Sequence, residues 1–279
     1  MIMKELTPDT GRAHVIGLTG APGVGKSTTA TSLVRALRAR GERVGVLAVD
    51  PSSPFSGGAL LGDRVRMQEH ALDSDVYIRS MATRGHLGGL AVATPQALRA
   101  FDAAGFDTVI VETVGVGQSE IEVAGTADTT VVLLAPGMGD GIQAAKAGIL
   151  EIGDIFVVNK SDRDGAQALV RELRTMVSLA QRGPEDWKPP IVLTVAHEHR
   201  GIEDLLEAVN RFRTAQLSTG HADARRVARA RREVEGIALA KLRAEFRLNG
   251  EAGLDDLAER VSRGELDPYA AADRVLVGR

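Results

Sequence analysis

The 279-residue sequence predicts an α/β fold, in which a mostly parallel sheet is flanked by helices. Three observations predict it. Short apolar runs alternate with amphipathic stretches, a glycine-rich loop joins the first apolar run to the first helix, and polar motifs follow the later runs. Parallel strands are buried on both faces, so they appear as continuous apolar runs. The loop and the motifs would then meet at the carboxyl ends of the strands, where open α/β sheets bind ligands.

The elements follow in the order of the chain. The strands are expected at 14–18, 43–49, 107–112, 130–135, 154–159 and 190–194. Helical spacing of apolar residues predicts helices at 26–40, 94–104, 141–150, 163–181 and 201–217. Tyr77-Ile78-Arg79 is compatible with one short edge strand.

The alternation of predicted strands and helices ends near residue 220. One long helical pattern covers 222–247, and shorter helices are expected at 253–263 and 267–277. We therefore divide the chain into an α/β domain of residues 1–219 and a helical segment of residues 220–279. Five arginines between 225 and 232 are interpreted as a solvated face, with a phosphate or partner site as the alternative. A helical segment without a core of its own must pack on the first domain or on a second subunit, and we expect a homodimer.

Composition limits the classes of function. The net charge is −3 and the pI about 6.1, so nothing indicates binding to nucleic acid or to an anionic membrane. The absence of cysteine excludes disulfides and thiolate metal sites. No stretch approaches the roughly 20 apolar residues of a membrane span, and Met1 to Gly11 does not resemble a signal peptide. A cytoplasmic protein is expected.

The glycine-rich loop has the sequence Gly-Ala-Pro-Gly-Val-Gly-Lys-Ser at 20–27. Its glycines let backbone N–H groups approach phosphate oxygens, which would sit at the positive end of the following helix. Lys26 should reach the β- and γ-phosphates, where it acts in catalysis, and the Ser27 hydroxyl should ligate Mg²⁺. The alternative is a chance glycine-rich turn. The pattern predicts a P-loop NTPase with nucleotide contacts from Ala21, Pro22, Gly23, Val24, Gly25, Lys26, Ser27 and Thr28.

The base of the nucleotide is predicted from Asn159-Lys160-Ser161-Asp162, which follows the apolar run 155–158. A carboxylate at Asp162 can accept hydrogen bonds from N1–H and the exocyclic amine of guanine. Adenine has no such pair of donors and would leave the carboxylate unsatisfied. We therefore expect Asn159, Lys160 and Asp162 to select GTP and GDP. A plain loop is the alternative.

A second base contact is expected from Thr194-Val195-Ala196, which follows the predicted strand that ends near residue 194. There a backbone N–H of Val195 or Ala196 would meet the guanine oxygen. This signal is thinner, because any exit from a strand into a loop looks similar.

The metal and the hydrolysis step are predicted from Glu112, which lies at the end of strand 107–112. A carboxylate at this position normally holds Mg²⁺ through a water, and the backbone N–H of Gly115 would meet the γ-phosphate. Ordinary small GTPases follow this glycine with a glutamine that orients the attacking water. Here Val116 follows it, and Gln118 comes two residues later. We expect slow hydrolysis that waits for a partner.

Two further segments carry candidate residues. Asp50 ends a strand near the expected Mg²⁺, and Asp63 could reach the metal or the water, although it could equally be a helix N-cap. Asp140, Gln143 and Lys146 share roughly one helix face after a glycine-rich loop, which suggests a switch segment, with plain surface as the alternative.

These motifs resemble the MeaB/ArgK family, P-loop GTPases that act as chaperones for adenosylcobalamin-dependent methylmalonyl-CoA mutase. The matching blocks are Gly-Ala-Pro-Gly-Val-Gly-Lys-Ser-Thr (20–28), Val-Asp-Pro-Ser-Ser (49–53), Gly-Asp-Arg-Val-Arg-Met (62–67), Val-Glu-Thr-Val-Gly-Val-Gly-Gln-Ser-Glu (111–120), Gly-Asp-Gly-Ile-Gln-Ala-Ala-Lys-Ala-Gly (139–148), Asn-Lys-Ser-Asp (159–162) and Asp-Pro-Tyr-Ala-Ala-Ala-Asp (267–273).

The resemblance implies a P-loop NTPase fold of the SIMIBI type and a homodimer formed through the C-terminal helices. It also implies Mg²⁺ and GTP or GDP as ligands, and the mutase as the client. The family's metal and hydrolysis roles fall on Asp50, Asp63 and Glu112, and its third switch falls around Asp140, Gln143 and Lys146.

Three other functions remain as alternatives. One is a non-enzymatic scaffold that binds the nucleotide without hydrolysing it, and another is a transport-linked ATPase or kinase of the ArgK (LAO/AO) type, against which Asp162 argues. The third is a metallochaperone GTPase for another metalloenzyme. Those proteins usually display histidine-rich or cysteine-based sites, whereas this chain has six scattered histidines and no cysteine.

Overall fold

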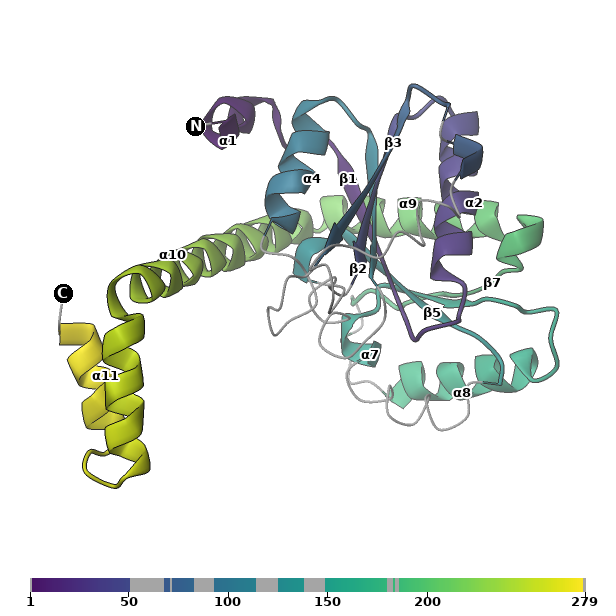
Figure 1. The fold of residues 1–279 in the computed structure, drawn as a ribbon. Coiled ribbons are helices and arrows are strands. Elements are labelled where there is room, and N and C mark those ends of the chain that lie inside the picture. Colours follow the sequence, from purple (N-terminus) through teal and green to yellow (C-terminus); the bar gives the residue numbers. More distant parts are fainter. Residues whose placement is uncertain are drawn as a thin grey trace. The chain divides into compact units, whose positions relative to one another are not determined.

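Seven strands form one sheet in the order β3-β2-β4-β1-β5-β6-β7, and every adjacent pair is parallel (Figure 1). The computed structural model describes residues 2–50, 68–70, 72–82, 93–113, 125–137, 149–179, 183 and 186–277. Its strands are β1 (His14–Thr19), β2 (Val44–Asp50), β3 (Val76–Ala82), β4 (Thr108–Thr113), β5 (Thr129–Leu134), β6 (Ile155–Val158) and β7 (Ile191–Leu193). The predicted parallel α/β fold is confirmed.

The inner strands are largely buried because helices cover both faces of the sheet. Every residue of β4, β5 and β6 is buried. The edge strand β3 is longer than the predicted segment of three residues and pairs with β2 from Val76 to Ala82. Tyr77 and Arg79 are exposed on this edge, so β3 lacks the continuous apolar run that marks the inner strands.

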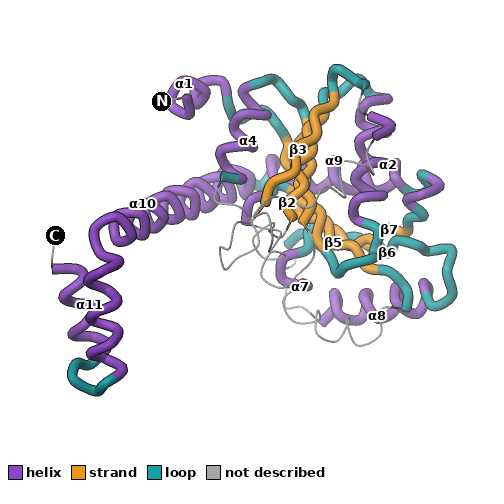
Figure 2. Tube along the Cα trace, viewed as in Figure 1, coloured by secondary structure: helices purple, strands orange, loops and turns teal. Residues whose placement is uncertain are grey.

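Two layers of helices enclose the sheet (Figure 2). On one face α2 (Lys26–Ala39) and α9 (Ile202–Ser218) pack against residues such as Ile110. On the other face α4 (Thr94–Ala103) covers Val109 and Val111, and α8 (Ala166–Leu179) covers Phe156 and Val158. Alternate residues of one strand therefore belong to different cores, as the pleat requires.

The remaining helices include two at the C-terminus, α10 and α11, where the sequence predicts three. They are α1 (Ile2–Leu6), η1 (Thr7–Asp9), η2 (Gln68–His70), α7 (Ile149–Ile152), η3 (Ala196–Glu198), α10 (His221–Ser262) and α11 (Pro268–Val277). The expected separation of 222–247 from 253–263 is wrong, because α10 continues through Gly250 and Gly253. Glycine in a helix costs about 1 kcal/mol but keeps its backbone donor, so it weakens the helix without ending it.

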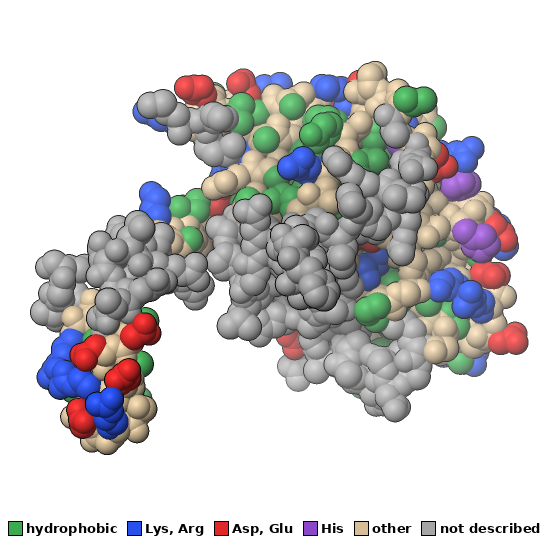
Figure 3. Space-filling view, viewed as in Figure 1, with side chains coloured by type: hydrophobic (Ala, Val, Ile, Leu, Met, Phe, Trp, Pro, Cys, Tyr) green, Lys and Arg blue, Asp and Glu red, His purple; other side chains and the backbone are tan. Residues whose placement is uncertain are grey.

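By its contacts the chain forms two compact units, Met1–Val227 and Ala228–Arg279. Helix α10 spans this division, which lies eight residues after the expected one (227 − 219). Acidic and basic side chains are interspersed on the C-terminal helices (Figure 3). Within the described ranges, no helix has both the length and the apolar character to cross a membrane.

The first turns of α10 are anchored by an ion pair. Both terminal nitrogens of Arg225 lie 3.0 Å from the two carboxylate oxygens of Asp154, directly before β6. The backbone N–H of Thr130 also donates to this carboxylate, at 2.8 Å. The Arg225 guanidinium lies 5.2 Å from the ring centroid of Phe212. The solvated-face interpretation is therefore wrong for Arg225, which is two-thirds buried.

We expect Arg225→Ala to lower the free energy of unfolding by about 2–3 kcal/mol at pH 7, because it leaves the buried carboxylate of Asp154 without its ion-pair partner. Burial raises the pKa of Asp154, and the bond from Arg225 opposes that rise. Because the native pKa of Asp154 is raised, its neutral carboxyl favours folding, and this contribution to stability is lost as pH rises through the native pKa. Without Arg225 the pKa should rise further, so the deficit of the variant should be largest at neutral pH and shrink toward pH ~4.

Urea unfolding at several pH values measures this effect. Arg226→Ala is the matched control, since Arg226 is the exposed neighbour. A deficit that does not change with pH, or one that Arg226→Ala shares, would contradict the assigned role of the ion pair.

Candidate nucleotide-binding site

The phosphate loop connects β1 to α2 through glycines with left-handed or otherwise positive φ. Gly20, Gly23 and Gly25 have φ of 138°, 81° and 97°. A Cβ at Gly20 would overlap the carbonyl oxygen of Leu133 in β5, and one at Gly25 would overlap the side-chain amide of Asn159. Positive φ thus favours glycine at all three positions, and the close approach of a neighbouring group also requires it at Gly20 and Gly25.

Lys26 places a positive charge at the first residue of α2. Its side chain is 7% exposed, and its Nζ donates to the carbonyl oxygens of Gly20, at 2.7 Å, and Ala21, at 3.1 Å. The loop therefore wraps around the ammonium group at the N-terminus of a helix. This arrangement favours an anionic group such as a phosphate.

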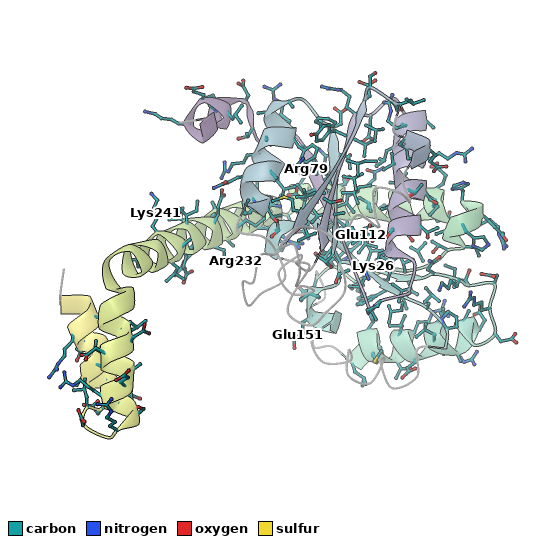
Figure 4. The ribbon with its side chains drawn as sticks, in the orientation of Figure 1. Lys26, Arg79, Glu112, Glu151, Arg232 and Lys241 are labelled. Carbon is teal, nitrogen blue, oxygen red and sulfur yellow. The ribbon has the colours of Figure 1, made fainter. Side chains whose placement is uncertain are left out.

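Ser27 and Glu112 come together beside Lys26, although they are far apart in sequence. The Ser27 hydroxyl donates to Glu112 Oε1 at 2.6 Å, and both residues are buried. Register explains the approach, since Glu112 in β4 pairs with Leu18 in β1, just before the loop. Figure 4 shows Lys26 and Glu112 at the same end of the sheet.

This donor set fits Mg²⁺. A hydroxyl and a carboxylate offer the hard oxygen ligands that Mg²⁺ prefers, and Mg²⁺ usually needs only one or two protein groups beside phosphates and water. In the part of the chain that the structure describes, no three His, Cys, Asp or Glu residues cluster as a metal site. The residues therefore suit a metal that arrives with a nucleotide.

The other predicted metal and switch residues are only partly described. Asp50 is the last residue of β2, two positions after Ala48, which pairs with Glu112. Its side chain lies outside the described part, and so do the following residues: Asp63, Gly115, Asp140, Gln143 and Lys146.

Asn159 joins the phosphate loop to residues 194–196, the predicted second base contact, which we call the guanine loop. Its Nδ2 donates to Val24 O at 2.8 Å. Its Oδ1 accepts hydrogen bonds from the Thr194 hydroxyl and from Ala196 N–H, each at 3.1 Å. The side chain is 2% exposed. Asn159 therefore braces two loops, and the Ala196 amide that we expected at the guanine oxygen donates to Asn159 in this structure. The Val195 amide also has a partner within its loop, Arg200 O, at 3.0 Å.

The rest of the motif surrounds this brace. Lys160 has φ 55°, and its Nζ donates to Gly23 O at 2.6 Å. Ser161 N–H donates to Thr194 O at 3.0 Å. Asp162 follows on the exposed surface, where its carboxylate is accessible to a base edge. The loops at 20–27, 159–162 and 194–196 thus contact one another at the candidate site.

Two residues near this site had no motif to indicate them. Ser32 lies on the buried face of α2 and donates to Ala196 O in the guanine loop. His199, which follows that loop in the chain, contacts the Ser32 hydroxyl. The one available signal was a polar residue among the apolar positions of α2.

The model of a family described as methylmalonyl Co-A mutase-associated GTPase MeaB matches residues 1–251. A protein of Pyrococcus abyssi named as a candidate GTPase is 46% identical over 281 residues, 99% of this chain and 86% of its own length. The GTPase ArgK of Escherichia coli is 39% identical over 222 residues, 78% of this chain and 67% of its own.

One solved structure resembles nearly the whole chain. A crystal structure of a LAO/AO transport system kinase has a TM-score of 0.71 and 26% identity, and it covers 98% of this chain and 84% of that one.

Proposed function

Because this chain belongs to the MeaB family of methylmalonyl Co-A mutase-associated GTPases, we propose that it is a nucleotide-gated chaperone. In this role, GTP binding and hydrolysis control cofactor loading and protection of an adenosylcobalamin-dependent methylmalonyl-CoA mutase. One observation carries the catalytic part of the proposal. The buried Ser27–Glu112 pair lies beside Lys26, and Asn159 of the guanine motif donates to Val24 O in the same phosphate loop.

The phosphate end of the site supplies electrostatic catalysis. Lys26 and the loop amides stabilise the charge that develops on the transferring phosphoryl group. Mg²⁺, when bound, would neutralise charge on the β- and γ-phosphates, and Ser27 and Glu112 are the described residues that would hold it. Asp50 and Asp63 complete the proposed metal and hydrolysis set.

The base end supplies specificity. Asp162 would accept from the two donors of guanine, and Lys160 and Asn159 hold the motif against the phosphate loop. Asp140, Gln143 and Lys146 are proposed as the switch through which nucleotide state reaches the client. Since Val116 stands where a water-orienting glutamine is common, we expect the unaided rate to be slow.

A homodimer is part of the proposal, with residues 220–279 as the dimerisation segment. Helix α10 exposes apolar side chains that a partner could cover. They are Val227, Val234, Leu239 and Leu254. Apolar side chains repeated along one exposed helix are a common feature of protein–protein interfaces.

GTP hydrolysis by the purified protein, measured alone and with methylmalonyl-CoA mutase, tests this function, with ATP as the control nucleotide. We expect a slow GTP-specific rate that rises when the mutase is added. A rate that is indifferent to the mutase would remove the client from the proposal. A preference for ATP would favour the transport-linked kinase instead.

A further inference from the structure

A chain of hydrogen bonds connects the phosphate helix α2 to the guanine loop. The Ser32 hydroxyl donates to Ala196 O at 2.6 Å. His199 Nδ1 lies 3.0 Å from the same hydroxyl, and Arg35 NH1 lies 3.0 Å from His199 Nε2. Ser32 is 2% exposed and Ala196 is 1% exposed. The inner end of the chain is thus shielded from water.

The direction of each bond is fixed by its partners. A guanidinium can only donate, so Nε2 of His199 must accept. A neutral imidazole that accepts at Nε2 carries its proton at Nδ1, which then donates to Ser32 Oγ. The serine has one proton, and it goes to Ala196 O. Arg35 therefore selects the tautomer that lets Ser32 hold the loop.

This series of hydrogen bonds fixes the position of the loop where a base would bind. Ala196 N–H is bound by Asn159 and Ala196 C=O by Ser32, so both backbone groups of one residue are fixed. The loop then closes tightly through His199, at φ 59°, and Gly201, where a Cβ would overlap Leu193 O. A small shift of Ala196 would therefore be opposed from two elements.

We propose that Ser32 and His199, with His199 held as the Nδ1–H tautomer by Arg35, are positioning residues for purine recognition at the guanine loop. They keep the loop at the position where the Ala196 N–H, which donates to Asn159 Oδ1 in this structure, would reach the oxygen at purine C6 once a nucleotide is bound. This inference rests on the proposed function as a guanine-nucleotide protein. It adds that specificity depends on a side-chain relay from the helix that begins with Lys26.

The variants are chosen to avoid backbone strain. Ser32→Ala removes the hydroxyl within a helix, where alanine is favourable. His199→Gly removes the imidazole and tolerates the positive φ, while His199→Asn also tolerates it and keeps a donor near the position of Nδ1. His197→Ala is the matched control, because His197 lies in the same turn, is exposed, and contacts Glu198 instead.

Equilibrium binding of GDP, IDP and ADP to the full chain measures the effect. Ser32→Ala and His199→Gly should weaken GDP and IDP equally, by about tenfold, the size of one well-placed hydrogen bond. ADP affinity should not change, His199→Asn should recover most of the loss, and kcat at saturating GTP should stay near that of the wild type.

Each result has one meaning. Equal weakening of ADP, or failure of His199→Asn to recover binding, would make the relay a general structural contact and overturn the proposal. Unchanged GDP affinity in the variants of a guanine-selective protein would also overturn it. A wild-type protein that does not prefer GDP to ADP would instead refute the proposed function.

Discussion

Replacing Lys26 with alanine should lower GTP hydrolysis at saturating nucleotide by about 100- to 1000-fold, since one preorganised charge at the transferring phosphoryl group is lost. Lys26 is buried within the loop that wraps around it and lies at the positive end of α2. Single-turnover hydrolysis measures the chemical step apart from binding and product release.

Lys188→Ala is the control, because Lys188 is an exposed lysine of the same compact unit. The proposed dimer should persist in the Lys26 variant, which sedimentation can follow. A monomeric Lys26 variant would show that nucleotide binding also supports assembly. Turnover close to that of the wild type would refute the catalytic role of Lys26.

Asp162→Asn should reverse the base preference of the site. A carboxylate accepts from both N1–H and the 2-amine of guanine, whereas an amide accepts once and presents its own N–H to the 2-amine. GDP affinity should therefore fall by about 100-fold or more, because a recognition site leaves its polar groups unpaired with the wrong partner. XDP carries an oxygen at C2, which the new amide can satisfy, so XDP should bind the variant more tightly than GDP.

Asp164→Asn is the matched control on the same exposed turn. Fluorescence titration with GDP, XDP and ADP measures the change in affinity. A second variant, Asp162→Ala, should weaken the binding of guanine nucleotides far more than it alters Mg²⁺ binding. Equal losses of affinity for GDP and ADP would contradict base recognition by Asp162.

The inner part of the fold was predictable because burial on two faces leaves a plain pattern. The apolar runs at β4, β5 and β6 are continuous, and the predicted bounds of these strands differ from the observed ones by one residue at each end. The edge strand β3 was underestimated because one side of it faces solvent. The continuity of α10 was missed because glycines weaken a helix by an amount that neighbouring turns can offset.

The site was predictable where chemistry is local. Residues 20–27 and 159–162 are contiguous motifs, and their meeting follows from parallel strands that end at one edge of the sheet. The Ser32–Ala196 and Arg225–Asp154 bonds join residues 164 and 71 positions apart. The spacing of residues in the sequence does not predict such long-range pairs. Arg225 therefore looked like the four arginines that follow it, until its buried partner was known.

The Arg225–Asp154 ion pair at the N-terminal end of α10 has a consequence for spectroscopy. The chain contains one tryptophan, Trp187, whose indole N–H donates to Asp154 O at 2.8 Å and whose ring meets Phe212 edge-on at 5.1 Å. All tryptophan emission thus comes from the junction of α10 with the start of β6, the strand that directly precedes Asn159. The unlabelled protein carries its own optical probe at that junction, so loosening of α10 could be followed in real time without a dye.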